Sequence, residues 1–361
     1  MLNPLLSADH HRVTVAVERL HGLAQTTGQP WDTVAADSAE RNFFHDSRWA
    51  RVLRDTYGFT PLAFISPAGA AHPGILPVLE INSWLTGRRG TSLPFTDECE
   101  PLVDHPEAFA SLWKAAIDYG RQRRWQSLEI RGGQRWFRGT TPSVTFRGHR
   151  LTLSRSEAAL FQALDPAVRR GIRKADQSGL TVEFARSPEA MRVFYGLLSK
   201  TRQRHGLPPQ PFSFFRMLQR TVLADGNGWV VLARKGSTPV AGAIFLHSGA
   251  NVIYKFGASD EAFQSLRGNN LVMWRAIQRY AQDGLTALDF GRTSLGNEGL
   301  RRFKLSWGTT ERVIAYFKYD LRRDGFVSIR DQADGWHNHV FRRLPQCVSQ
   351  CIGAALYKHI D

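Results

Sequence analysis

The sequence predicts an α/β (α+β) protein made of two successive modules, each a mixed β-sheet flanked by helices. Three observations support this class. The chain has 361 residues, which suits two domains of about 150–200 residues better than a single core. Its hydrophobic content of 42%, with 11% aromatic residues, is that of a folded globular protein. Strands and helices also recur in a similar order in the two halves, which indicates duplication of one module.

The first half alternates short strands with helices. We expect a helix through residues 47–53, strands over 62–66 and 74–81, and a helix over 106–123 that leads to a strand over 127–131. The segment from Arg88 to Asp97 reads as a loop. These elements form a predicted first module over residues 1–150.

The second half repeats this order more clearly. A basic helix is predicted over 156–177, with Ser154 or Ser156 as its cap and Gly179 as its stop. A strand over 181–185 and helices over 188–204 and 211–223 precede three meandering strands over 228–234, 240–247 and 251–258. A helix (269–282), a strand (285–290), a short helix (298–305) and a strand (310–319) complete a second module over residues 151–322. Residues 323–361 are expected to form a helical tail.

Several classes of protein are excluded. No apolar run reaches about 18 residues, the length that spans a membrane. The first residues lack the basic start and apolar core of a signal peptide. Cys99, Cys347 and Cys351 are too few for a disulfide framework, and no His or Cys pair completes a metal site. We therefore expect a cytoplasmic protein without a metal, with the inner face of the membrane as an alternative location.

The net charge of +15 points to an anionic partner. Eight arginines fall between residues 121 and 150 with Glu129 as the only acid: Arg121, Arg123, Arg124, Arg131, Arg135, Arg138, Arg147 and Arg150. A second cluster consists of Arg169, Arg170, Arg173 and Lys174. Arginine forks onto phosphate and carboxylate, so tRNA, a nucleotide-linked or lipid-linked pyrophosphate, or an anionic membrane surface are candidate partners. The alternative is general solubility charge.

The stretch from Tyr254 to Lys304 holds the candidate functional residues. In the predicted strand 251–258, alternation places Tyr254 on one face and Lys255 on the other. The run Arg267-Gly268-Asn269-Asn270 opens a helix, whose free N–H groups beside an arginine make a phosphate or carboxylate site. An ordinary Asn-capped helix is the alternative.

Further candidates follow downstream and upstream. Asp289 lies in an apolar strand and must be paired, with Arg292, Lys255 or another cation. Arg301 and Lys304 are three residues apart and are expected to share one helical face. His205 follows a basic helix end in a Gly/Pro-rich loop, where a histidine either reaches a cleft or stays on the surface.

These runs together resemble a known family. The region 240–319 is similar to the second module of FemAB-like transferases, which belong to the GNAT acyltransferase superfamily, through Ala241-Gly242-Ala243, Tyr254-Lys255-Phe256-Gly257-Ala258, Asn269-Asn270-Leu271, Leu288-Asp289-Phe290-Gly291 and Phe303-Lys304. The runs from Val168 to Ala175 and from Arg204 to Pro208 are similar to motifs of the same family. Phe43-Phe44-His45 and Leu93-Pro94-Phe95 also fit, so the resemblance covers nearly the whole chain.

The resemblance implies a tandem GNAT fold with a basic cleft between the modules. It implies an acyltransferase (EC 2.3 class) in peptidoglycan or exopolysaccharide biosynthesis that transfers an aminoacyl group from charged tRNA, or an acyl group from another carrier. Residues 265–270 depart from the pyrophosphate signature of coenzyme-A-binding members, and the long heptad arm of classical Fem proteins is absent. The donor is therefore either aminoacyl-tRNA or an acyl-CoA or acyl carrier, and no firm cofactor is implied.

Roles for the candidate residues follow from this chemistry. Lys255, Arg292 and Lys304 are expected to bind an anionic acceptor or the developing oxyanion, and Asp289 or His205 to act as the base. A phosphate-bearing substrate is assigned to Arg169, Arg173 and Lys174, and further substrate contacts to Tyr254, Arg267, Asn269 and Asn270.

Two rival readings stay open. The first is a CoA-dependent N- or O-acetyltransferase acting on a sugar or small molecule. The second is a non-catalytic basic module that binds RNA or an anionic membrane, with arginines on one convex face. The segment after Pro345 has the apolar spacing of a helix that either rests on a bilayer or packs on its own domain.

Overall fold

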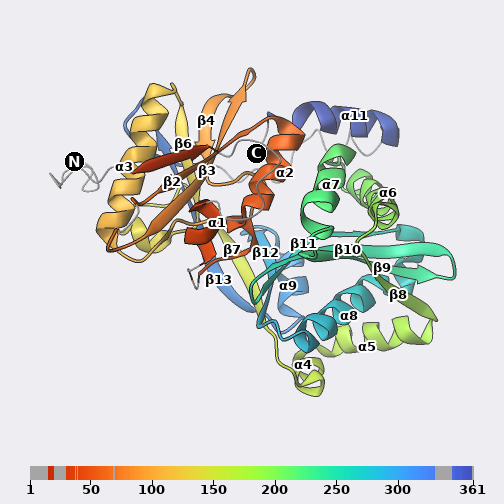
Figure 1. Cartoon of the computed structure of the whole chain (residues 1–361). Coiled ribbons are helices and arrows are strands. Elements are labelled where there is room, and N and C mark those ends of the chain that lie inside the picture. The colour runs from red at the N-terminus through yellow and green to blue at the C-terminus, as the bar shows by residue number, and fades with distance from the viewer. Residues whose placement is uncertain are drawn as a thin grey trace. The chain divides into compact units, whose positions relative to one another are not determined.

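The computed structural model describes residues 15–19, 30–36, 38, 40–67, 70–329 and 344–359, which form two compact units. Unit 1 holds the described residues up to Phe146 together with 314–329 and 358–359. Unit 2 holds Arg147–Val313 and residues 344–357. Residues 314–322, which the sequence assigned to the second module, therefore belong to unit 1 (Figure 1).

Unit 1 contains a mixed sheet. Its strand order is β1 (Ala16–Arg19), β2 (Thr60–Ile65), β3 (Gly74–Ser83), β4 (Gly87–Thr91), β6 (Ser127–Arg131) and β13 (Thr310–Asp320). Neighbours are antiparallel except β4 and β6, which are parallel because α3 (Pro106–Gln122) lies in the connection between them. The short β5 (Leu102–Val103) pairs with β3, and β14 (Gly325–Val327) pairs with β13.

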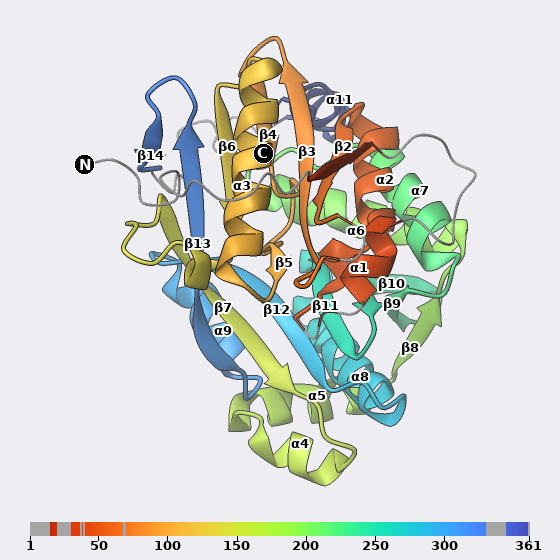
Figure 2. The ribbon, with the colours of Figure 1, turned by 60° about the vertical axis from the view of Figure 1, so that its left-hand side comes forward.

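Helices cover this sheet because their apolar residues recur at helical spacing. Phe109, Leu112, Trp113 and Ala116 of α3 are buried against β2, β3, β6 and β13, and Figure 2 shows α3 running along the strands. Helix α1 (Pro30–Ala36) also packs on β2 and β3, and α2 (Ser47–Tyr57) packs on β2.

The prediction of a loop from Arg88 to Asp97 is wrong for its first residues. They form β4, which pairs with β3 from Ser83↔Gly87 to Leu79↔Thr91. The strand has no apolar alternation because the indole of Trp125 covers Gly90, where a Cβ atom would lie 2.3 Å from the ring. Backbone pairing with β3 and packing of Trp125 therefore stabilise this strand, whose own side chains bury little apolar surface.

Unit 2 contains a second mixed sheet. Its order is β7 (Val144–Thr152), β12 (Ala287–Ser294), β11 (Asn251–Ser259), β10 (Thr238–Ser248), β9 (Gly228–Lys235) and β8 (Leu180–Ala185). Strands β8 to β11 are antiparallel, and β11 is parallel to β12 across helix α8 (Gly268–Gln282). In both units, antiparallel strands are thus followed by one parallel pair. The last strand of each unit, β13 in unit 1 and β7 in unit 2, comes mostly from the other half of the sequence. This shared order supports duplication of one module.

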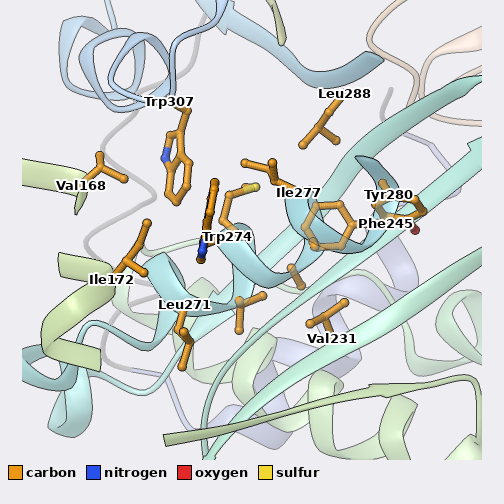
Figure 3. Packing of buried hydrophobic residues seen from close by; sticks show 14 of the residues in the cluster. Val168, Ile172, Val231, Phe245, Leu271, Trp274, Ile277, Tyr280, Leu288 and Trp307 are labelled. Carbon is orange, nitrogen blue, oxygen red and sulfur yellow. The ribbon is translucent and has the colours of Figure 1, made fainter. Parts of the chain in front are cut away.

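Helices pack on both faces of this second sheet. Helices α5 (Pro166–Gln177) and α8 bury Ile172, Leu271 and Trp274 with Val231 in one core, seen in Figure 3. On the opposite face, Phe194 of α6 (Pro188–Arg204) lies against Gly242, where a Cβ would be 3.3 Å from its ring. Helix α7 (Phe212–Leu218) follows α6 and packs against it.

The predicted basic helix over 156–177 is two helices. Helix α4 (Glu157–Ala163) begins at Ser156, whose hydroxyl accepts from the Ala159 N–H, which confirms one of the two predicted caps. The helix stops before Pro166, because proline disfavours a helical residue before it and lacks an N–H. Asp165 then caps α5 by accepting from the Ala167 N–H.

The C-terminal segment forms α11 (Gln346–Leu356), which packs on unit 2. Gly353 lies against the Pro209 carbonyl, and the Gln350 amide donates to the Ser199 hydroxyl of α6. Val348 stays 40% exposed. Of the helices in the described ranges, none has the length and hydropathy needed to cross a bilayer.

Candidate active site in unit 2

The parallel strands β11 and β12 diverge after a short paired segment. Their register covers only Asn251↔Ala287, Val252↔Leu288 and Ile253↔Asp289. Strand β11 continues to Ser259 along β10, and Lys255 is an extra residue there, since Ile244 faces Phe256 while Phe245 faces Tyr254. A bulge re-aims the side chains around it, so the strict alternation predicted from Tyr254 to Ala258 is interrupted at Lys255.

The diverging end of β12 is held by side chains. Gly291 has φ 73°, which kinks the strand, and its N–H donates to Asp289 Oδ1 over 2.6 Å. The buried Lys304 Nζ, from α9 (Glu298–Leu305), donates to the Gly291 and Arg292 carbonyls, both at 2.8 Å. Lys304 therefore satisfies buried backbone acceptors.

Asp289 has a cationic partner on β13. Arg312 Nη2 lies 3.3 Å from Asp289 Oδ2, which confirms that this carboxylate is paired with a cation. Arg301, expected to share a face with Lys304, instead pairs at the surface with Glu311 and Glu298. The prediction of a common cationic face on α9 is wrong, because Lys304 points into the protein and Arg301 toward neighbouring carboxylates.

Tyr254 and Gly257 are packed against each other. A Cβ atom on Gly257 would lie 1.8 Å from the Tyr254 hydroxyl, so only glycine leaves room for this phenol. The ring also contacts Phe245 and Phe290, at centroid distances of 5.5 and 6.0 Å. Burial raises the pKa of Tyr254 to about 12, so the hydroxyl remains a proton donor at neutral pH.

A pocket of about 430 Å³ opens at the N-terminus of α8. It is lined by the start of β10, the end of β11, the 3-10 turn over Glu261–Leu266, the first turn of α8 and one residue of α9: Val240, Ala241, Ser259, Asp260, Phe263, Gln264, Ser265, Arg267, Gly268, Asn269, Asn270 and Phe303. Arg267, Asn269 and Asn270, predicted to bind substrate, therefore line one pocket.

The first turn of α8 has no side-chain cap. Its N-cap residue, Arg267, is exposed and has φ 61°, a left-handed conformation that costs a residue with a Cβ about 1 kcal/mol. Gly268 packs on β10, where a Cβ would lie 3.0 Å from that of Ala241. An uncapped helix start with an arginine at its N-cap is an electropositive site, and the prediction of an ordinary Asn-capped helix is wrong.

The end of β11 beside this pocket is tied to α6. The Thr201 hydroxyl accepts from the Ser259 N–H at 2.9 Å and donates to the Ser259 carbonyl at 3.0 Å. Lys200 Nζ pairs with Asp260 at 2.5 Å and holds the pKa of that carboxyl below its usual range. Sequence reasoning missed Thr201 and Lys200, because nothing in a helical sequence indicates which strand end its residues contact.

The other predicted residues lie outside this pocket lining. His205 is exposed at the C-terminal end of α6, and Arg173 and Lys174 are exposed on α5. Arg173 sits over the Phe161 ring, and Arg169 is half-buried on the same helix. Arg292 is half-buried on β12, and its carbonyl accepts from Lys304.

Many arginines of the sequence cluster from 121 to 150 are paired with carboxylates. The ion pairs are Arg121–Asp324, Arg123–Glu80, Arg131–Glu129, Arg135–Glu40 and Arg147–Glu298. Five of the eight arginines thus bind acids of this chain. This pairing removes much of the continuous anion-binding surface that the sequence suggested.

Comparisons with known proteins point to one superfamily. Residues 166–305, from the start of α5 to the end of α9, match the family described as acetyltransferase (GNAT) domain. The lipid II:glycine glycyltransferase of Staphylococcus saprophyticus is 21% identical over a part that covers 47% of this chain and 57% of that protein. The chain thus spans little more than half the length of this curated relative.

Solved structures share the fold. The crystal structure of FemX matches with a TM-score of 0.67 and 16% identity, covering 85% of this chain and 98% of that one. A tandem GNAT protein from the clavulanic acid biosynthesis pathway matches with a TM-score of 0.51 and 11% identity, again covering 85% and 98%. The sequence match to the GNAT family thus covers α5 to α9, and the solved structures extend the likeness in fold to most of the chain. In fold, the chain is similar to FemX and to a protein with two GNAT modules.

Proposed function

We propose that the chain is an acyl- or aminoacyltransferase that forms an amide or ester on a cell-envelope or exopolysaccharide precursor. The observation that carries this proposal is the uncapped start of α8, which opens into the pocket at the end of β11, the strand that diverges from β12. The start of α8 can hold an anion, and the opening between the diverging parallel strands β11 and β12 can admit the acyl group. The match of the GNAT family to the same elements supports it.

The pocket at α8 suits a phosphate or diphosphate. The backbone N–H groups of Gly268 and Asn269 open the helix, where the helix dipole favours negative charge, and Arg267 adds a full positive charge. Asp260 is the acid of the lining, and its charge is balanced by Lys200. We infer that the phosphate-bearing substrate binds here, while the basic face of α5 has a lesser part.

The distance along β11 from the pocket to Lys255 indicates where the reaction centre lies. Lys255 at the bulge lies four residues before Ser259 of the pocket lining. At about 3.3 Å per residue, the two positions are about 13 Å apart along the strand. A donor anchored at α8 therefore places its carbonyl between the diverging strands.

The chemistry is attack of an acceptor amine or hydroxyl on this carbonyl. A C–N or C–O bond forms, the bond from the carbonyl carbon to the carrier oxygen or sulfur breaks, and the departing group takes up a proton. We propose that Lys255 stabilises the oxyanion and that the protonated Tyr254 hydroxyl donates a hydrogen bond to the reacting atoms. Asp289 is proposed as a positioning residue, since it holds the Gly291 N–H, and His205 stays a candidate base.

Two donor classes fit the site. The name of the staphylococcal relative specifies glycine transfer to lipid II, which supports an aminoacyl donor, such as charged tRNA, and a lipid-linked acceptor for this chain. Acyl transfer from coenzyme A to a sugar or small molecule is the second candidate, favoured by the pocket at the start of α8, where a diphosphate can bind. A non-catalytic binding module fits less well, because a formed pocket and internally paired arginines are present.

Replacing Arg267 by glycine separates binding from stability. The variant removes the charge and relieves the left-handed strain, so the free energy of unfolding should stay equal or rise by up to about 1 kcal/mol. Affinity for inorganic pyrophosphate and for coenzyme A, measured by titration calorimetry, should fall about tenfold, the loss of a charge-assisted hydrogen bond. Arg267→Lys, which keeps the charge, should retain most of the affinity. Equal binding by wild type and Arg267→Gly would place the anion elsewhere.

A further inference from the structure

The turn between β3 and β4 exposes two large apolar side chains. Trp84 is 83% exposed, the most of any large hydrophobic residue in the described ranges, and Leu85 beside it is 53% exposed. The turn lies at the far end of the strand pair, at the upper edge of unit 1 in Figure 2. Adjacent large apolar side chains exposed at one turn are uncommon on a protein surface and typically mark an interaction site.

The turn is rigid, so this exposure is fixed by the fold. The Ser83 hydroxyl accepts from the N–H groups of Leu85 and Thr86, at 3.2 and 3.0 Å, and is 2.9 Å from His359 Nδ1. The Thr86 hydroxyl donates to the His359 carbonyl at 2.9 Å. The buried His359 also contacts the Trp84 ring edge-to-face at 5.3 Å. These bonds hold the backbone while both apolar side chains point to solvent.

Cations surround this turn. The Gln126 N–H donates to the Arg88 carbonyl, and Arg88 Nη1 donates to the Arg123 carbonyl, so the segment 123–126 lies beside the base of the turn. Arg89 donates to the His359 carbonyl. Arg124 is exposed, with φ 59°. The nearby acid Glu80 is buried and bonded to Arg123 and Trp125. Because Arg123 is balanced by Glu80, it is chiefly Arg88, Arg89 and Arg124 that make the surface near the turn positive.

We propose that this turn, with Trp84 and Leu85 as the apolar tip and the surrounding arginines as its basic collar, docks unit 1 on an anionic lipid bilayer. A stable protein interface needs about 800 Å² per partner and about 20–30 residues, far more than two side chains offer. Reversible binding to a bilayer needs a smaller contact area. An indole at the membrane interface, one aliphatic side chain below it and arginines at the level of the phosphates are sufficient.

Membrane docking at this turn does not depend on the acyl-transfer proposal. It places the membrane contact on the turn between β3 and β4 and not on the C-terminal helix. The sequence placed that contact on the C-terminal helix, which in the structure packs on α6 and contains no charged residue. The turn combines an exposed tryptophan, which α11 does not contain, with adjoining cations. It also gives a FemAB-like protein a means to meet a lipid-linked acceptor at the membrane surface.

Co-sedimentation of the full chain with vesicles tests the docking. Wild type should bind vesicles of phosphatidylcholine with phosphatidylglycerol, and bind phosphatidylcholine alone about tenfold or more weakly. The double variant Trp84→Ser/Leu85→Ser should lose about tenfold or more of its partition to the mixed vesicles. Arg124→Gln should lose about fivefold on the mixed vesicles and nothing on phosphatidylcholine. The matched control is Val17→Ser, a solvent-exposed apolar residue of the same unit, which should bind as wild type does.

Each other outcome overturns the proposal. Equal partition of the double variant and wild type would show that the tip does not enter the bilayer. Loss of partition in Val17→Ser to the same extent would show unspecific apolar binding. A wild-type dimer in sedimentation velocity that the double variant abolishes would assign the tip to a contact between copies of the chain. Circular dichroism of each variant shows whether it is folded, and quenching of Trp84 fluorescence by brominated phosphatidylcholine, compared between wild type and Trp84→Phe, gives an independent readout.

Discussion

Replacing Lys304 by methionine is expected to lower the free energy of unfolding by about 3 kcal/mol, the cost of leaving two buried carbonyls without a donor. Methionine keeps most of the side-chain volume, so the change isolates the ammonium group. The two carbonyls belong to Gly291 and Arg292, in the part of β12 that has already left β11. Because the opening between the strands depends on this kink, transfer activity should fall with stability.

The matched control is Arg302→Met on the same helix. Arg302 is exposed and donates a long hydrogen bond of 3.4 Å to the Glu298 carbonyl, so its loss should change the free energy of unfolding by no more than about 0.5 kcal/mol. Urea unfolding of the three proteins measures both effects. If Lys304→Met kept wild-type stability and lost only substrate affinity, Lys304 would be the substrate ligand that the sequence suggested, and its structural role would be wrong.

Lowering the pH from 6.5 toward 4 is expected to remove about 3 kcal/mol of stability through His45 alone. Burial lowers the pKa of this histidine to about 4. Its Nδ1 accepts from the Asn42 N–H at 3.1 Å and its Nε2 lies 2.9 Å from the Glu100 carbonyl, so the neutral ring fits both partners. The unfolded chain takes up the proton near pH 6.5 and the folded chain only near 4. Stability is therefore full above pH 6.5 and is lost as the pH falls through this window.

The variant His45→Gln supplies the comparison. It should be less stable than wild type at pH 7, but the difference in the free energy of unfolding should shrink as the pH falls to 4. Only wild type has a residue at position 45 that stays neutral in the folded state while it is protonated in the unfolded chain. His149 also has a lowered pKa, from burial and from Lys304, and it contributes equally to both proteins. Urea unfolding at a series of pH values measures the difference. A difference that does not change with pH would contradict the assignment.

The sequence predicted the element order of unit 2 well because the pattern there is local. The strands 228–234, 240–247 and 251–258 correspond to β9, β10 and β11, and the helix 269–282 corresponds to α8. Arg267 and its neighbours could be identified because a helix start and a charge are both visible in sequence. The bulge at Lys255 could not, since it depends on how β10 pairs with β11.

The partners of the candidate residues depend on long-range contacts. The sequence predicts Lys304 as a ligand for an anion on a helical face shared with Arg301, yet it is buried because β12 kinks at Gly291 and leaves two carbonyls to satisfy. Arg312, the partner of Asp289, lies on a strand that carries no sign of the site. Sequence spacing describes one element at a time. The exchange of final strands between the halves, which places residues 314–320 in unit 1, also has no local signature.

We propose that unit 2 transfers an acyl group from a donor whose anionic part binds at Arg267. The direct test offers acetyl-CoA and glycyl-tRNA separately to the full chain with a lipid extract that contains envelope precursors, and follows both donor and product by mass spectrometry. We expect one donor to lose its acyl group and an acceptor to gain the mass of that group as an amide or ester. Arg267→Gly should slow this transfer, while Arg267→Lys should retain most of it. Transfer at equal rates by wild type and Arg267→Gly, or no loss of the acyl group from either donor, would contradict it.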